Sequence, residues 1–317
     1  MKALVIEDGS AHLLERELPS PELDQILVEV AAAGINRADL LQIAGHYPAP
    51  QGWPEDVPGL EFSGTVADTG DQVTRFTEGD HVFGIVGGGA HATHLMTRED
   101  LCVRVPASLD LVEAGGVPEA FMTAHDALVT QGGMRSGERV LVHAVASGVG
   151  TAAVQIARAL GAGTVGTSRT EGKLERVREL GLDDPVLADE NMAQKIGEVD
   201  FVVDLVGGDY LQTDVDVCRV KGRIVLVGLM AGASTELDLS QVLRKRLTLR
   251  GTVLRSRPHH EKAAATEHFA REVIPLFERK QLKPVIDATY PLSKSAEAFG
   301  LVQSNSPLGK VLLIPPA

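Results

Sequence analysis

The hydrophobic pattern divides the chain into two parts with different periods. In residues 1–110, short apolar runs alternate with polar residues or are interrupted by glycine, as in 25–30 and 59–66, and a turn at 78–80 precedes the apolar residues 82–83. A period of two predicts strands, and little of this part has the period of a helix. We therefore expect an irregular, β-rich domain.

After residue 108 the pattern changes. Strand-like runs at 140–145, 164–167, 201–204 and 224–227 alternate with helical patterns at about 149–160 and 172–180. This rhythm predicts an α/β fold, a doubly wound parallel sheet with helices on its faces. Residues 260–280 predict an amphipathic helix, and 311–314 predict a last strand that returns to the first domain. A chain of 317 residues also exceeds one compact core, which favours two domains.

Residues 139–157 are the most informative segment. A buried strand runs into a turn of small residues, Ala144–Gly150, and an alanine-rich helix follows at once. Such a turn places backbone N–H groups and the positive end of a helix against a pyrophosphate. The match to G-x-G-x-x-G is partial, because Val145 and Ser147 stand at the first two glycine positions and Gly150 at the third. An ordinary strand–helix corner is the alternative.

The next strand bears on the cofactor. NAD enzymes usually end this strand on a carboxylate that binds the ribose hydroxyls. Here the strand ends on Ser168 and Arg169, and Lys173 follows one turn later. Cationic and hydroxyl groups suit a 2′-phosphate, which a carboxylate would repel. The segment therefore predicts NADPH, with solvated helix-start charges as the alternative.

Composition narrows the function classes. The net charge of −13 argues against a nucleic-acid or anionic membrane surface. Two cysteines, Cys102 and Cys218, are too few for a disulfide framework or a four-thiolate zinc site, and they are compatible with a reducing cytoplasm. No run approaches the about 20 apolar residues of a membrane span, and the N-terminus has no signal-peptide pattern. We expect a cytoplasmic protein.

An ordered series of motifs extends over nearly the whole chain. It comprises residues 34–41 (GINRADLL), 58–64 (PGLEFSG), 117–124 (VPEAFMTA), 144–150 (AVASGVG), 228–230 (GLM), 254–257 (LRSR) and 309–310 (GK). In this series the chain resembles the zinc-independent quinone oxidoreductases of the medium-chain dehydrogenase/reductase superfamily. It is most similar to the tumour-suppressor-inducible quinone oxidoreductase subgroup.

The resemblance implies a GroES-like catalytic domain from residues 1–120 and 265–317, and a Rossmann NADPH-binding domain from 121–264, with the cofactor in the cleft between them. It implies that the pyrophosphate meets Ser147, Gly148 and Val149, next to Gly150 of the turn, and that the 2′-phosphate meets Lys173. The nicotinamide and ribose side would be lined by Gly228, Leu229, Met230, Leu254 and Lys310. A tyrosine that lines the adenosine pocket of the nearest relatives is replaced here, around Ala188.

The same resemblance implies a site without metal. Zinc-dependent members of the superfamily bind a catalytic zinc at positions that correspond here to Asn36, Leu60 and Glu119. An amide and a leucine are not zinc ligands, and one carboxylate does not hold the ion alone. The spacing of His91 and His94 invites a metal assignment, but no third ligand accompanies them.

Without a metal, hydrogen bonds must polarise the carbonyl that accepts hydride. The positions that face the quinone and nicotinamide in the family are Tyr47 and Asn36 here, and Thr123 stands where the family contacts the nicotinamide. A phenol and an amide can both donate to a developing oxyanion. A surface aromatic and a turn residue are the alternatives for Tyr47 and Asn36, and His46 is a further candidate proton donor.

We therefore expect an NADPH-dependent quinone oxidoreductase. An NADPH-dependent reductase of the activated C=C bond of 2-enals and 2-enones is the alternative, since the same site would serve it. A weakly catalytic nucleotide-sensing or RNA-binding relative is the alternative from another class. The expected partners are a small-molecule quinone or activated alkene, without nucleic acid or membrane, and the resemblance implies a homodimer.

Overall fold

The computed structural model describes residues 1–316, which form two compact units. The inserted unit is Thr123–Val253, and the split unit combines Met1–Met122 with the chain from Leu254 onward. The second boundary predicted from the sequence, 264/265, falls inside helix α9 (His259–Glu272). This helix packs on strand β7 (Cys102–Arg104) and on the π-helical segment η2 (Pro118–Met122), both in the split unit. The chain therefore re-enters the split unit before α9 begins.

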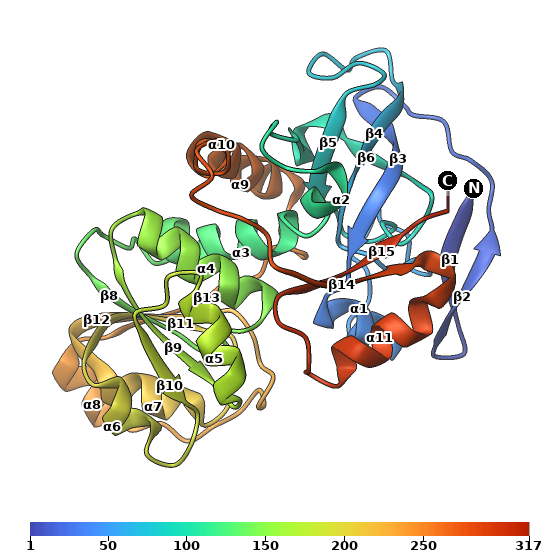
Figure 1. Cartoon of the computed structure of the whole chain (residues 1–317). Helices are drawn as coiled ribbons and strands as arrows, with labels where there is room; N and C mark the ends of the chain where they lie inside the picture. Colours follow the sequence, from blue (N-terminus) through green and yellow to red (C-terminus); the bar gives the residue numbers. More distant parts are fainter. Residues whose placement is uncertain (317) are drawn as a thin grey trace. The chain divides into compact units, whose positions relative to one another are not determined.

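The inserted unit is a parallel sheet wound with helices (Figure 1). Its strands are β8 (Arg139–Val142), β9 (Gly163–Ser168), β10 (Asp184–Leu187), β11 (Val199–Asp204), β12 (Cys218–Leu226) and β13 (Thr248–Gly251). Its helices are α3 (Thr123–His125), α4 (Gly148–Ala159), α5 (Glu171–Arg178), α6 (Met192–Ile196), α7 (Tyr210–Val217) and α8 (Leu239–Lys245), with a π-helical segment η3 (Asp126–Gln131).

All neighbouring strands of this sheet are parallel, in the order β10-β9-β8-β11-β12-β13. Figure 1 shows α4 on one side of the sheet and α7 and α8 on the other, so Val140, Leu141 and Val142 of the central strand are completely buried. The strand order reverses between β8 and β11. In such sheets a ligand binds outside the carboxyl ends of the strands at this reversal.

The split unit is rich in strands, as the alternating pattern predicted, and most of its strand pairs are antiparallel. Its strands are β1 (Lys2–Glu7), β2 (Ser10–Glu15), β3 (Gln25–Gly34), β4 (Glu61–Thr69), β5 (His81–Ile85), β6 (His94–Arg98), β7, β14 (Ile286–Pro291) and β15 (Lys310–Ile314). Its helices are α1 (Arg37–Ile43), α2 (Leu111–Ala114), α9, α10 (Ile274–Glu278) and α11 (Ser295–Gln303), with 3₁₀ turns η1 (Glu99–Leu101) and η4 (Leu292–Lys294).

The last strand closes the split unit. β15 pairs antiparallel with β3, with Leu312 opposite Gly34, which confirms the predicted return of residues 311–314 to the first domain. The predicted helix over 260–280 is wrong in one respect: it is two helices, α9 and α10. Pro275 lies at the start of α10, where its missing N–H is tolerated, whereas it would break the ladder of one continuous helix.

Candidate active site

A buried cluster of charged and polar side chains lies where β3, β4 and β15 of the split unit meet. Glu61 is completely buried at the start of β4, and its Oε1 forms an ion pair with the Nζ of Lys310. The same Oε1 accepts a hydrogen bond from Asn36 Nδ2 at 2.9 Å. A Cβ at Gly34 would lie 2.2 Å from Oε1, so glycine is required for Glu61 to approach the strand.

The ammonium group of Lys310 binds three groups inside this cluster. Besides Glu61, it donates to Asn36 Oδ1 at 2.7 Å and to the carbonyl of Ile35 at 3.3 Å. An ammonium has three donors, and all three are used here. The contact of Lys310 with the cofactor, implied by the resemblance, stays a prediction, whereas these bonds give the residue a role in holding Asn36 and Glu61.

Asn36 also forms several hydrogen bonds inside this cluster. Its Nδ2 points toward Glu61 and toward the carbonyl of Gly34 at 3.4 Å, and its backbone N–H donates to Asp39 at 2.7 Å. With Lys310 bound to its Oδ1, this amide has partners on both sides. It is better suited to ordering the cluster than to donating to an acceptor molecule.

The cluster does not fit a catalytic zinc. Leu60 offers no ligand atom, the Asn36 amide is committed to protein groups, and the Lys310 ammonium already supplies a positive charge beside Glu61. Among residues 1–316, no three or more His, Cys, Asp or Glu side chains are grouped to hold a metal. The ring of His91 is buried against Gly34, and His94 contacts Thr93 through Nδ1 at 3.1 Å. A metal-free site remains a prediction.

Tyr47 is half-buried and is held by Arg255. The guanidinium carbon of Arg255 lies 4.8 Å from the centre of the Tyr47 ring, and Nη1 donates to the Tyr47 carbonyl at 3.0 Å. Arg255 also donates to the Gly87 carbonyl at 3.0 Å and to Gln42 Oε1. One side chain therefore fixes both the ring and the backbone of the tyrosine. Burial raises the pKa of the Tyr47 phenol against the opposing effect of Arg255, which keeps it protonated as a donor. His46 beside it is exposed.

The predicted nucleotide turn lies at the carboxyl end of β8 in the inserted unit. Ser147 is the N-cap of α4, and its Oγ accepts the N–H of Gly150 at 3.0 Å. The N–H groups of Gly148 and Val149 begin the helix and have no acceptor within it. A Cβ at Gly150 would lie 2.6 Å from the Ala144 carbonyl oxygen, so glycine permits the close packing of helix on strand. This turn fits a pyrophosphate.

The residues predicted to contact the rest of the cofactor are distributed around the same edge of the sheet. Ser168 ends β9 and is buried, Arg169 is exposed, and Lys173 lies in the first turn of α5. Gly228, Leu229 and Met230 follow β12, and the two large side chains are each 52% exposed. Of the remaining predicted residues, Thr123 has a buried hydroxyl without a hydrogen-bond partner among the described residues, and Leu254 is a buried residue of the split unit.

Beneath the turn, a buried histidine fixes the strands. His143 directly follows β8, and its two ring nitrogens contact Thr167 Oγ1 at 2.7 Å and Asp214 Oδ1 at 2.8 Å. Burial raises the pKa of Asp214 to about 6, although His143 opposes the shift. These bonds join β8, β9 and α7, and thereby support the turn.

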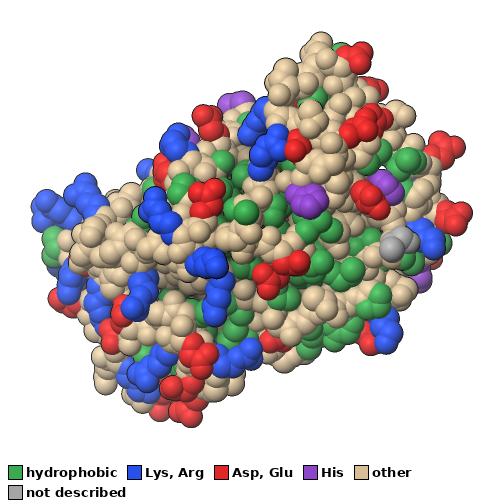
Figure 2. Space-filling model, turned by 45° about the horizontal axis from the view of Figure 1, so that its top comes forward, with side chains coloured by type: hydrophobic (Ala, Val, Ile, Leu, Met, Phe, Trp, Pro, Cys, Tyr) green, Lys and Arg blue, Asp and Glu red, His purple; other side chains and the backbone are tan. Residues whose placement is uncertain are grey.

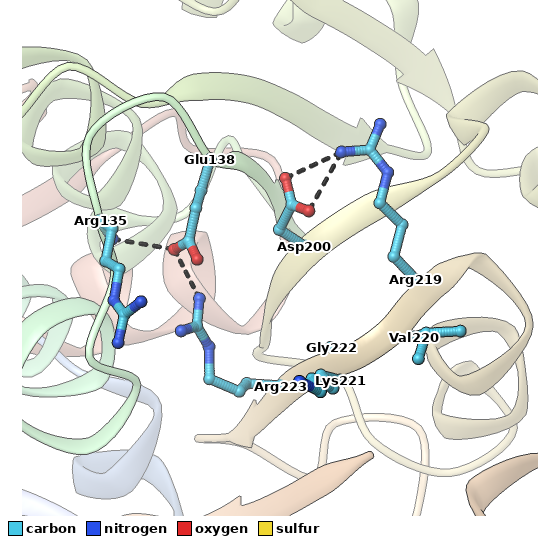
Figure 3. A pocket seen from close by; sticks show the side chains of 8 residues that line it. All are labelled: Arg135, Glu138, Asp200, Arg219, Val220, Lys221, Gly222 and Arg223. Atoms are coloured by element: carbon cyan, nitrogen blue, oxygen red, sulfur yellow. Dashed lines mark hydrogen bonds and ion pairs between the residues drawn. The ribbon is translucent and has the colours of Figure 1, made fainter. Parts of the chain in front are cut away.

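A pocket of about 340 Å³ lies at the opposite end of the sheet (Figure 3). Figure 3 shows Glu138 with Arg223 and Asp200 with Arg219, two ion pairs near the amino ends of β8, β11 and β12. Because ligands of such sheets bind at the carboxyl ends, this pocket is not the predicted nucleotide site.

Sequence reasoning missed two residues of the candidate site. The sequence assigns no role to Arg255 within the motif 254–257, and it predicts Glu61 only as part of a strand. A carboxylate inside the apolar segment 57–66 is an available signal, since a buried charge requires a partner. The partner itself, Lys310, lies close to the other end of the chain, so no local pattern indicates it.

Comparison with known proteins agrees with this architecture. Residues 22–130 match the family described as alcohol dehydrogenase GroES-like domain, and residues 148–271 match the one described as zinc-binding dehydrogenase. The quinone oxidoreductase of Lama guanicoe is 30% identical over 99% of this chain and 97% of that protein. A solved alcohol dehydrogenase superfamily protein from Novosphingobium aromaticivorans is 30% identical, with a TM-score of 0.89 over 99% of both chains. The apo JamJ enoyl reductase is 25% identical, with a TM-score of 0.86 over 99% of both chains.

The GroES-like and Rossmann units together define a medium-chain dehydrogenase/reductase, an oxidoreductase class whose members use a nicotinamide cofactor. Within that superfamily, the chain belongs to the quinone oxidoreductase family. In residues 1–316, no helix combines the length and the apolar character needed to cross a membrane.

Proposed function

We propose that this protein is an NADPH-dependent quinone oxidoreductase that transfers hydride from the nicotinamide to a quinone without a metal ion. The observation that carries the proposal is the fixation of Tyr47 by Arg255. A donor that is already oriented loses little entropy when the acceptor carbonyl develops charge. Quinones are electron-poor and need only such modest activation. The family relationship to quinone oxidoreductases supports the same substrate class.

The proposed cofactor is NADPH, with Ser147, Gly148, Val149 and Gly150 at the pyrophosphate. Ser168, Arg169 and Lys173 would bind the 2′-phosphate, because the end of β9 presents a hydroxyl and a cation and no carboxylate, and Lys173 follows in the first turn of α5, beside Glu171. Gly228, Leu229, Met230, Leu254 and Thr123 are proposed for the nicotinamide side. The unpartnered hydroxyl of Thr123 suits a hydrogen bond to the carboxamide.

Reduction of the C=C bond of 2-enals and 2-enones is the second candidate. The likeness to JamJ enoyl reductase favours it, and a phenol that polarises a quinone carbonyl also polarises an enone carbonyl. An RNA-binding role is disfavoured by the net charge of −13. Figure 2 shows basic and acidic side chains interspersed over the face it presents, without the basic stripe typical of nucleic-acid binding.

One assay separates these functions. NADPH oxidation is followed with 1,4-benzoquinone, 9,10-phenanthrenequinone and a 2-enal, and with NADH in parallel. The proposal expects turnover with both quinones and a lower KM for NADPH than for NADH. Turnover confined to the enal would support the alternative, and none with any acceptor would refute both. The variant R169A/K173A should raise the KM for NADPH and leave that for NADH unchanged, with the exposed pair R176A/R178A on α5 as control.

We also propose a homodimer formed through the inserted unit. Edge strand β13 has a free side, because it pairs only with β12 in the described sheet. Leu249 of this strand is 49% exposed, and Leu239 and Leu243 of α8 are 70% and 77% exposed. An exposed edge strand beside exposed leucines favours pairing with a second copy. Like the oligomer, a cytoplasmic location remains a prediction.

A further inference from the structure

Glu119 is a carboxyl group for which the cluster provides no cationic partner. It lies in η2, and its Oε2 atom is buried without a hydrogen-bond partner among the described residues. Its backbone N–H donates to Glu61 Oε2 at 2.8 Å, so the two acidic residues are neighbours. A buried carboxylate without a partner is costly, and such a group tends to keep its proton.

The groups around Glu119 explain why it stays neutral. Burial is the largest cause that raises its pKa, and the negative charge of Glu61 is the next; Asp39 of α1 acts in the same direction. Lys310 and Arg255 oppose the shift, yet the pKa reaches about 8. Lys310 offsets only part of the shift, because its ammonium is also paired with Glu61.

Glu119 is also coupled to the proposed acceptor side of the split unit. Its ionised form raises the pKa of the Tyr47 phenol and opposes the lowering of the pKa of the Lys262 ammonium in α9. Arg255, which holds Tyr47, is among the groups that act on Glu119. A protonated carboxyl therefore lies within electrostatic reach of the residue proposed to hold the acceptor oxygen. Glu61, by contrast, already accepts from Lys310, from the Asn36 amide and from the Glu119 N–H.

We propose that Glu119 is a catalytic acid that supplies the proton consumed when the acceptor is reduced, an inference that rests on the proposed function. Hydride leaves C4 of NADPH with its electron pair and joins the quinone, which becomes a hydroquinone monoanion. The O–H bond of Glu119 then breaks and a new O–H bond forms on the anion. The products are NADP⁺, hydroquinone and the Glu119 carboxylate, which water reprotonates before the next turnover.

The direction of this transfer is favourable. A phenolic oxygen has a pKa of about 10, and the carboxyl pKa of about 8 makes Glu119 the stronger acid. The equilibrium favours transfer by roughly a hundredfold. Arg255 and Lys310, the two cations that act on Glu119, stabilise the carboxylate that remains. A general acid whose pKa lies near the working pH contributes about 10²–10⁴-fold in rate.

The test compares E119Q with wild type in the full-length protein with NADPH and 1,4-benzoquinone. E113Q, at an exposed acid of α2, is the control. Wild type and E113Q should show kcat falling as the pH rises through about 8. E119Q should lose that inflection and, at pH 7, about a hundredfold in kcat, with the Kd for NADPH unchanged. An E119Q profile that keeps the wild-type inflection, or a change in KM alone, would overturn the inference.

A second measurement uses only the wild-type protein, so it tests the inference even if E119Q does not fold. The wild-type infrared spectrum at pH 7 should contain the carbonyl band of a protonated carboxylic acid, and the band should vanish as the pH rises through about 8. Its absence at pH 7 would overturn the inference. Failure of the proposed function gives a different result, because wild type would then reduce no acceptor. That result would also refute the catalytic role of Glu119. An active wild type with an equally active E119Q refutes the inference alone.

Discussion

Replacing Lys310 with Met is expected to destabilise the split unit strongly. Methionine keeps most of the side-chain length but removes the ammonium, and it leaves Glu61 with the Asn36 amide and the Glu119 N–H as donors. The side chains of Lys310 and Glu61 are only 6% and 0% exposed, so water hardly screens the charge that remains. Breaking a buried pair costs about 3–5 kcal/mol. Because two hydrogen bonds to Glu61 persist, we expect K310M to lower the free energy of unfolding at pH 7 by about 3 kcal/mol, the lower end of this range.

The single tryptophan makes the measurement specific. Trp53 lies in the split unit and packs against Gly87, where a Cβ would lie 2.4 Å from its ring. Its fluorescence in urea therefore reports this unit, even if the two units unfold separately. With a slope of about 2 kcal/mol per molar urea, a loss of about 3 kcal/mol lowers the midpoint by about 1.5 M.

Two controls make the explanation refutable. K294M removes an exposed lysine and should change stability by less than about 0.5 kcal/mol. E61Q/K310M removes both charges of the buried pair, so it should recover at least half of the loss seen in K310M. A double variant as unstable as K310M would show that packing, and not an uncompensated carboxylate, explains the effect. A K310M midpoint equal to that of wild type would refute the reasoning altogether.

Three further predictions follow from the other parts of the candidate site and surface. Y47F should lower kcat by about 10²–10³-fold with little change in KM, since one donor to the developing oxyanion is lost; unchanged turnover across several quinones would contradict it. R255K should lower kcat with quinone and leave the KM for NADPH unchanged, because lysine keeps the charge but not the planar fork that holds Tyr47; quinone kinetics equal to those of wild type would rule this out. L239E/L243E should sediment as a monomer if α8 contributes to the dimer, and a wild type that is itself monomeric would exclude the proposed interface.

The sequence by itself determined the parts of the fold that depend on local pattern. The parallel sheet and the turn around Gly150 follow from the spacing of apolar and small residues, because strand and helix periods are local properties. The motifs in chain order were enough to indicate the family. The return of β15 to the first domain was also expected from the position of its apolar run. Each of these patterns and motifs occupies only a few consecutive residues.

The tertiary structure alone decided which polar groups meet. Lys310, Glu61 and Asn36 come from three strands or strand ends far apart in sequence, and their pairing depends on sheet register. Arg255 reaches Tyr47 across 208 positions. The pKa of a carboxyl depends on burial and neighbouring charges, as Glu119 shows. Partners, burial and protonation are properties of the packed chain, because electrostatic energies depend on distances that only the fold defines.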